Sequence, residues 1–193
     1  MIAITAVDLF ERNGFSATTI DDIATAAGIS RTTFFRHCAT KEAAVLVDDA
    51  GLESELITAA GQVSTRRPLR DLEAIWESMT EVFDADPAGH DRFLRVRRLM
   101  RDNPALLAAG LERDARLTER IAAALRGRSG TEPLDAYAVA ESFALGMRLT
   151  FDEWVRRADQ GSPEAPSSLN DVYRQVRAAV REANGGDDEP RLR

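Results

Sequence analysis

The sequence predicts an all-α fold of about nine helices. Apolar residues make up 44% of the 193-residue chain, and Ala and Leu dominate them, which favours helix over strand. They recur at helical spacing in long segments that Gly, Pro and charged residues separate. A two-helix motif near the start predicts a small N-terminal domain over residues 1–47 and a larger helical domain over residues 48–183. The Gly- and charge-rich residues 184–193 predict a disordered tail.

The first predicted helix spans residues 2–13 and ends before Gly14. Its mostly inward-facing side chains would be Ile4, Val7, Leu9 and Phe10. With apolar residues of the next two helices, this face predicts a small core that holds the following motif in place.

Residues 19–38 are typical of two short helices joined by a tight turn. Thr19 can cap the first helix, with Asp22 as its partner in a capping box. Gly28 suits the positive φ at which a helix commonly ends, and Ser30 can cap the second helix. This arrangement matches the helix-turn-helix that reads DNA, although a helical hairpin that only packs is the simpler alternative.

The second helix of the motif begins with long or polar side chains, where a recognition helix contacts base edges. Arg can pair bidentately with guanine, and a Thr methyl can touch the methyl of thymine. Lys41, at the start of the next helix, would share a phosphate with the helix N–H groups. The predicted DNA-binding residues are Thr18, Thr19, Arg31, Thr32, Thr33, Phe35, Arg36, His37 and Lys41.

One stretch of the chain resembles the DNA-binding domain of the TetR family of repressors: residues 9–45, LFERNGFSATTIDDIATAAGISRTTFFRHCATKEAAV. Matching residues are Leu9–Phe10, Gly14–Phe15, Thr18–Thr19–Ile20, Ile23–Ala24, Ala27–Gly28, Ser30, Thr33–Phe34, Arg36 and Lys41. Two positions depart from the family. Phe35 stands where a Tyr hydroxyl usually reaches a backbone phosphate, and Cys38 replaces a larger Phe.

A looser resemblance connects residues 32–51 and 92–125 to one subgroup of TetR-like regulators, in which Phe at the position of Phe35 is usual. The second domain of that subgroup is associated with acyl-CoA-like ligands, and its members occur beside the mycofactocin system. The resemblance implies that some arginines of the helix over 90–102 meet CoA phosphates. The simpler interpretation is a solvated basic stripe that pairs with Asp91, Asp102, Glu112 and Asp114.

Beyond the motif, helical spacing predicts six further helices. They span residues 40–60, 68–85, 90–102, 104–126, 134–157 and 169–183. The helix over 40–60 would link the two domains mechanically. Large apolar residues on the later helices predict a cavity for a small apolar or acyl-CoA-like effector, although plain core packing is the alternative for each of them. They are Trp76, Met79, Phe83, Phe93, Met100, Phe143, Met147 and Phe151.

The helix over 134–157 is apolar on two faces and therefore has to bury both. One face can meet the chain's own core and the other a second copy, although a central helix of a monomer is the alternative. A homodimer built as a four-helix bundle would hold two recognition helices about 34 Å apart on a palindromic operator in double-stranded DNA. The predicted dimer residues are Trp154, Val172, Tyr173, Val176 and Val180.

The charge of the chain predicts modest non-specific DNA affinity. The net charge is −7, and residues 1–47 hold four basic against five acidic residues, a net of −1. Phosphate contacts need local positive charge. The sequence therefore leaves two interpretations open, a ligand-responsive repressor and a helical ligand-binding or interaction module with weak or lost DNA affinity.

Other classes of function find little support in the sequence. It contains neither a Gly-rich phosphate loop nor a nucleophile elbow, and His90 has no second His or Cys at ligand spacing. We expect no enzyme activity, cofactor or metal. Apolar segments stay short of about 18 residues, which predicts no membrane span. The single Cys, Cys38, fits a reducing cytoplasm.

Overall fold

The computed structural model describes residues 1–46, 50–128, 130–161 and 168–183. Every regular element within them is a helix, which confirms the predicted all-α fold. The helices are α1 (Ile2–Asn13), α2 (Ile20–Ala26), α3 (Arg31–His37), α4 (Lys41–Ala44), α5 (Ala50–Ala60), α6 (Pro68–Asp84), α7 (Pro87–Asp102), α8 (Pro104–Arg126), α9 (Pro133–Asp159) and α10 (Leu169–Ala183). The predicted tail over 184–193 lies outside the described residues.

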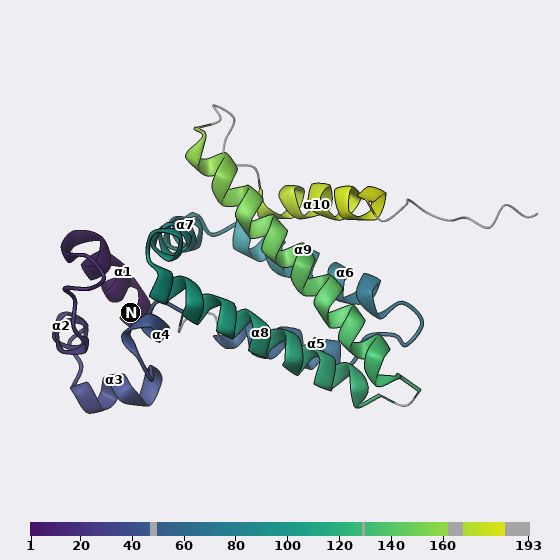
Figure 1. Cartoon of the computed structure of the whole chain (residues 1–193), viewed down its shortest axis with the longest axis horizontal. Helices are drawn as coiled ribbons and strands as arrows, with labels where there is room; N and C mark the ends of the chain where they lie inside the picture. Colours follow the sequence, from purple (N-terminus) through teal and green to yellow (C-terminus); the bar gives the residue numbers. More distant parts are fainter. Residues whose placement is uncertain (47–49, 129, 162–167, 184–193) are drawn as a thin grey trace, which may run out of the picture.

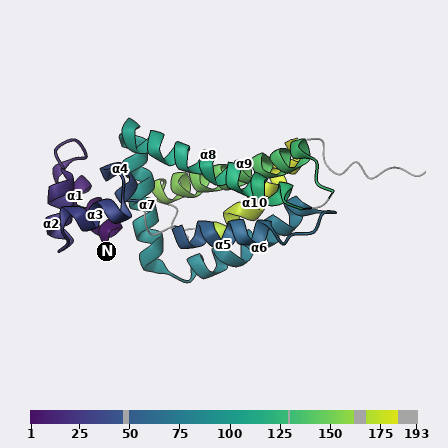
Figure 2. The ribbon, with the colours of Figure 1, turned by 90° about the horizontal axis from the view of Figure 1, so that it is seen from below.

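The helices form two groups. Figures 1 and 2 show α1 to α4 together at one end, the long helices α5, α6, α8, α9 and α10 bundled at the other, and α7 running across between them. The four helices α6, α7, α8 and α9 each begin with a proline at their first position. Proline suits this position because the first N–H groups of a helix have no intrahelical partner. Pro87 explains why α7 starts earlier than the predicted residue 90.

The predicted continuous helix over 40–60 is wrong. The structure has two helices there, α4 and α5, and residues 47–49 between them lie outside the described part. Val45 turns into the N-terminal core, where it is buried, and the carbonyl of Leu46 accepts a hydrogen bond from Arg113 Nη1 at 2.7 Å. These contacts replace the continuation of α4, so the described residues contain ten helices rather than about nine.

The N-terminal core extends beyond the helices that the sequence assigned to it. Its buried residues from α1 to α3 include Val7, Leu9, Phe10, Ile23 and Phe34. Val96 and Met100 of α7 and Leu106 of α8 belong to the same apolar cluster. Ile4, predicted to face mostly inward, is instead 49% exposed. The first group of helices is thus packed directly on the second.

A second apolar cluster fills the long bundle. It joins residues of α5, α6, α8, α9 and α10, among them Leu56, Leu72, Trp76, Ile121, Leu125, Ala140, Phe143 and Tyr173. Ion pairs reinforce the contact of α6 with α10, where Glu73 lies 2.6 Å from Arg177. The carboxylate of Asp84 accepts hydrogen bonds from the N–H groups of Leu169 and Asn170 and so caps α10. α10 is therefore an integral part of this bundle.

An added methyl group should affect stability differently at two glycines that lie in the middle of helices. At Gly146 in α9 a Cβ would meet Tyr173 at an ordinary 3.7 Å, whereas at Gly110 in α8 it would lie 2.1 Å from Met100 Cε. Gly146→Ala should therefore stabilise the protein by up to about 1 kcal/mol through helix propensity. Gly110→Ala should gain less or destabilise, because Met100 has to move. Urea unfolding of both variants compares them, and equal stabilisation would contradict the close packing of α7 on α8.

Candidate nucleic-acid interface

The helix-turn-helix forms through the local contacts that its sequence predicted. Thr19 Oγ1 accepts a hydrogen bond from the N–H of Asp22 at 3.2 Å, and the Asp22 carboxylate accepts one from the Thr19 N–H at 2.8 Å. Hydrogen bonds from the hydroxyl and N–H of Thr19 lower the pKa of Asp22. Gly28 has a φ of 67°, and Ser30 Oγ accepts from the Thr33 N–H at 3.0 Å. These caps fix where α2 ends and α3 begins.

α3 presents one exposed face and buries the other. Phe34 is fully buried in the N-terminal core, and Thr33 is half-buried. The remaining predicted DNA-binding residues of this helix are exposed: Arg31, Thr32, Phe35, Arg36 and His37. The helix therefore carries a polar and basic surface on a rigid apolar anchor.

Arg31 has two neighbours on this surface. Its guanidinium lies 2.6 Å from Asp21 Oδ1 and 5.3 Å from the centre of the Phe35 ring. Exposed ion pairs of this kind contribute about 0–1 kcal/mol, so a base or phosphate can displace Asp21 at small cost. The ring of Phe35, 45% exposed, remains beside the guanidinium.

Two predicted DNA-binding residues have structural roles that the sequence did not reveal. Lys41 Nζ donates to the carbonyl oxygens of Phe15 at 2.7 Å and Thr18 at 3.0 Å, and it lies 4.1 Å from the centre of the Phe15 ring. The buried hydroxyl of Thr18 donates to the carbonyl of Gly14 at 2.9 Å. Both residues brace the segment between α1 and α2. The partners of Lys41 lie 23 and 26 residues away along the chain, beyond the reach of a local motif.

Arg95 of α7 neutralises acidic charge on α1. It pairs with Asp8 and with Glu11, whose Oε2 lies 2.6 Å from Arg95 Nη2. Hydrogen bonds to Glu11 and then to Asp8 raise the pKa of Arg95 above its usual value. The single positive charge of Arg95 is thus shared between two of the five acidic residues counted in the N-terminal domain and offsets one negative charge. This contact joins α1 to α7 in addition to the shared apolar cluster.

Two further arginines of α7 also meet carboxylates, whereas a third lies over an aromatic ring. Arg98 and Arg101 both pair with Asp159 at the end of α9, at 2.8 and 2.5 Å. Arg97 lies 4.6 Å from the centre of the Phe151 ring. The pairing of this stripe agrees with the simpler interpretation of the sequence. Two of the predicted partners take part, since Asp91 lies 3.7 Å from Arg95 and Asp102 lies 3.4 Å from Arg101. The shorter contacts are with Asp8, Glu11 and Asp159, which the sequence did not indicate.

The predicted effector-binding residues separate into three clusters. Trp76, Met79, Phe143, Met147 and Phe151 lie together in the core of the bundle. Phe83 and Phe93 pack beside them around Trp154, with Phe151 touching both groups. Met100 is apart from these residues, because it belongs to the N-terminal core. The structure therefore brings seven of the eight predicted residues into adjoining clusters and places Met100 at the junction with α1.

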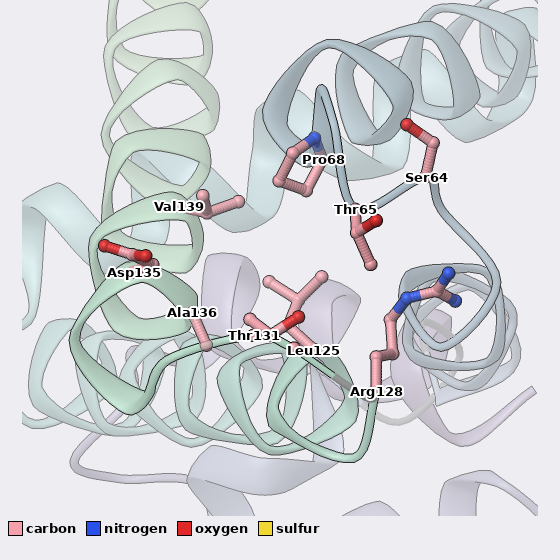
Figure 3. A pocket seen from close by; sticks show the side chains of 10 residues that line it. Ser64, Thr65, Pro68, Leu125, Arg128, Thr131, Asp135, Ala136 and Val139 are labelled. Atoms are coloured by element: carbon pink, nitrogen blue, oxygen red, sulfur yellow. The ribbon is translucent and has the colours of Figure 1, made fainter.

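A pocket lies apart from these eight predicted residues. It is found where α8 turns into α9, opposite the start of α6 (Figure 3). Its volume is about 70 Å³. Its lining includes the apolar side chains of Pro68, Leu125, Ala136 and Val139, together with the charged side chains of Arg128 and Asp135 and three hydroxyl-bearing residues. Leu125, Ala136 and Val139 are also part of the apolar cluster that contains Trp76. Sequence spacing did not indicate this pocket, since its residues come from three separate turns and helix ends.

The predicted dimer residues are mostly turned inward. Trp154, Val172 and Tyr173 are no more than 1% exposed within the single chain, and Val176 and Val180 are half-buried. The first three residues are thus not accessible to a partner in this structure, because α9 and α10 bury them against α6 and each other. The exposed apolar side chains of α9 are instead Leu134, Tyr137 and Leu149.

The described residues contain no group of three His, Cys, Asp or Glu side chains placed to hold a metal ion. None of the described helices is both long and apolar enough to span a membrane.

Comparison with known proteins identifies the family. Residues 2–46 match the family model of bacterial regulatory proteins, tetR family. The HTH-type transcriptional regulator TcmR of Streptomyces glaucescens is 32% identical over 80% of this chain and 71% of its own. The putative mycofactocin biosynthesis transcriptional regulator MftR of Mycobacterium tuberculosis is 30% identical over 89% of this chain and 86% of its own.

A solved structure shares the fold. FadR of Thermus thermophilus, a TetR family transcriptional repressor crystallised with lauroyl-CoA, aligns with 100% of this chain and 97% of its own at a TM-score of 0.56 and 24% identity. The sequence relatives are transcriptional regulators rather than enzymes. The helix-turn-helix, the helical second domain and these two relatives together show that the chain belongs to the TetR family of bacterial transcriptional regulators.

Proposed function

We propose that this regulator is a homodimeric repressor that binds a palindromic operator through α3 and leaves it when an apolar or acyl-CoA-like ligand enters the second domain. The observation that carries the proposal is the exposed face of α3, held by Phe34 in a core that continues into α7 and α8. A recognition helix needs such a rigid mount, because base contacts depend on its position in the major groove.

The charge of the N-terminal domain is less unfavourable for DNA binding than the sequence indicated. Arg95 pairs with Asp8 and Glu11 on α1 and offsets one of their two negative charges. This distribution favours the repressor over the alternative, a ligand-binding module with weak or lost DNA affinity. That alternative still predicts ligand binding without salt-sensitive binding to DNA.

The dimer in this proposal uses the outer face of α9. Leu134, Tyr137 and Leu149 are 76%, 52% and 38% exposed, and all three lie on this one helix. Large exposed apolar side chains along one helix favour burial against a second copy. The half-buried Val176 and Val180 of α10 would lie at the margin of this interface.

The effector in this proposal occupies the aromatic clusters between α6, α7 and α9. Support comes from the adjoining rings of Trp76, Phe143 and Phe151, and from the adaptable side chains of Met79 and Met147 beside them. The resemblance to the mycofactocin-associated subgroup and the lauroyl-CoA complex of FadR favour an acyl-CoA-like ligand. Arg95, Arg98 and Arg101 of α7 already pair with carboxylates, so they do not favour contacts between this helix and the phosphates of a ligand.

α7 is the mechanical link in this proposal. Phe93 contacts the aromatic cluster, whereas Arg95, Val96 and Met100 on the same helix contact the N-terminal domain. A ligand that displaces α7 therefore displaces α1 as well. The ligand has to bind the DNA-bound and free conformations with different affinity, and that difference is the coupling free energy.

Fluorescence anisotropy with DNA from upstream of the protein's own gene tests the proposal. We expect salt-sensitive, sequence-specific binding by a dimer and release on addition of lauroyl-CoA. If lauroyl-CoA binds but no DNA is bound specifically at low salt, the ligand-binding module without DNA affinity is the better description.

Arg36→Ala and Lys41→Met distinguish DNA contact from structural support. Arg36 is exposed, so its loss should weaken operator binding, lower the salt slope by about one and leave stability unchanged. Lys41→Met should lower the free energy of unfolding by about 1–3 kcal/mol, because two carbonyl groups lose a charged donor. A stable Lys41→Met protein with a reduced salt slope would instead support the phosphate contact predicted from the sequence.

Tyr137→Glu tests the dimer surface. A charge in a buried interface costs several kcal/mol. This variant should therefore sediment as a monomer at micromolar concentration and lose operator affinity. Val82→Glu is the matched control, since Val82 is 74% exposed on α6, outside the proposed interface. Dimers of unchanged stability in Tyr137→Glu would move the interface away from this face of α9.

Arg95→Ala tests the link through α7. Its removal should reduce the ligand-induced change in operator affinity by about threefold, as expected for a partly exposed ion-pair network worth about 0.5–1 kcal/mol. Arg116→Ala removes an exposed ion pair with Glu112 within α8 and is the control. Equal ligand responses of the two variants would show that the coupling does not pass through Arg95.

A further inference from the structure

The indole of Trp76 is a buried hydrogen-bond donor without a partner. Trp76 is 4% exposed, and none of the described residues places an acceptor within hydrogen-bond distance of its Nε1. More than nine in ten buried polar groups in proteins are paired, and an unpaired one costs about 1–3 kcal/mol. This donor therefore requires a functional explanation.

Trp76 differs from the other buried polar side chains that have an unpaired atom. Arg128 and Arg177 use other nitrogens of their guanidinium groups, the first with the carbonyl of Gly61 and the second with Glu73. The Asn170 amide donates to the carbonyl of Glu77, and His90 lies 3.3 Å from Asp84. The indole N–H is the single polar group of a tryptophan side chain, so Trp76 makes no polar side-chain contact within the described structure.

The surroundings of Trp76 include two phenylalanine rings, one tyrosine ring and flexible thioethers. The rings of Phe143, Phe151 and Tyr173 lie 6.2, 5.9 and 6.3 Å from it, all edge-on. Met79 and Met147 belong to the same cluster, and unbranched thioether side chains readily change rotamer. This environment suits the apolar part of a ligand, and the indole N–H offers it one directional contact.

Space for a ligand begins close to this cluster. The pocket in Figure 3 is lined by Leu125, Ala136 and Val139, which belong to the same apolar cluster as Trp76. Val139 lies one turn of α9, roughly 6 Å of helix, before Phe143, and Phe143 contacts Trp76. The pocket of about 70 Å³ therefore reaches to within one helical turn of the rings around the unpaired donor.

We infer that the effector of this regulator carries a neutral carbonyl oxygen that accepts a hydrogen bond from Trp76 Nε1, with an apolar chain among the surrounding rings. The inference rests on the proposed ligand-binding function of the second domain. A neutral carbonyl fits because the rings that contact Trp76 carry no charge, so an ionised group would lose its hydration without compensation there. Thioesters and esters of aliphatic acids are the chemical class that combines both features.

The contact makes Trp76 a specificity-determining residue. A ligand with a carbonyl at this position pairs the buried donor, and a ligand of the same shape without the carbonyl leaves it unpaired. One neutral hydrogen bond of about 1.4 kcal/mol corresponds to tenfold in affinity. Discrimination between two such ligands should therefore be about tenfold.

Isothermal titration calorimetry with two matched probes tests the inference. Lauroyl-CoA carries a thioester carbonyl, and S-dodecyl-CoA has a methylene group in its place. Wild-type protein should bind lauroyl-CoA about tenfold more tightly, Trp76→Phe should bind both probes equally, and Trp154→Phe should retain the preference. Trp154 is a suitable control because it is equally buried but lies in the neighbouring aromatic cluster.

The outcomes separate this inference from the proposed function. Equal binding of both probes by wild-type protein would overturn the role of Trp76 and leave the acyl-CoA-like effector intact. Binding of neither probe would overturn the acyl-CoA-like effector, and this inference with it. The wild-type comparison involves no substitution, so it remains decisive even if Trp76→Phe fails to fold.

Discussion

The packing of α1 on α7 supports the position of α3, the proposed DNA-reading helix. α3 has only seven residues, and helices of this length are not stable alone, so its orientation depends on the burial of Phe34. The cluster around Phe34 is completed by Val96 and Met100 of α7 and by Leu106 of α8. The core that holds α3 therefore includes residues beyond the first 47. In the proposed mechanism, a displacement of α7 reaches α3 through this apolar cluster.

The sequence predicted the helix-turn-helix well because its determinants are local. Thr19, Gly28 and Ser30 act on backbone groups one to three residues away, and all three have the predicted role. The all-α fold and most helix positions followed from apolar spacing for the same reason. The exposed residues of α3 were likewise predictable, because Phe34 marks the buried side of a short helix.

Features that depend on distant residues were not predictable. The two acceptors of Lys41 and the α1 partners of Arg95 lie 23 to 87 residues away, and no periodic pattern reports them. For the same reason, the sequence could not show that the chain itself buries Trp154, Val172 and Tyr173. Spacing revealed that α9 has two apolar faces, but it could not reveal which one the chain covers itself. The break between α4 and α5 was missed because apolar residues continue at helical spacing through it.

In the proposed complex with DNA, the ion pair between Arg31 and Asp21 affects how the protein searches a genome. On random DNA, a phosphate would have to compete with Asp21 for the guanidinium, and the N-terminal domain has little other positive charge to retain the duplex. Residence on random sequence should therefore be brief, with frequent hopping between sites. At an operator, a guanine that accepts two hydrogen bonds replaces the single carboxylate contact. A low density of charge thus increases the ratio of specific to non-specific binding, which matters more in a genome than affinity alone.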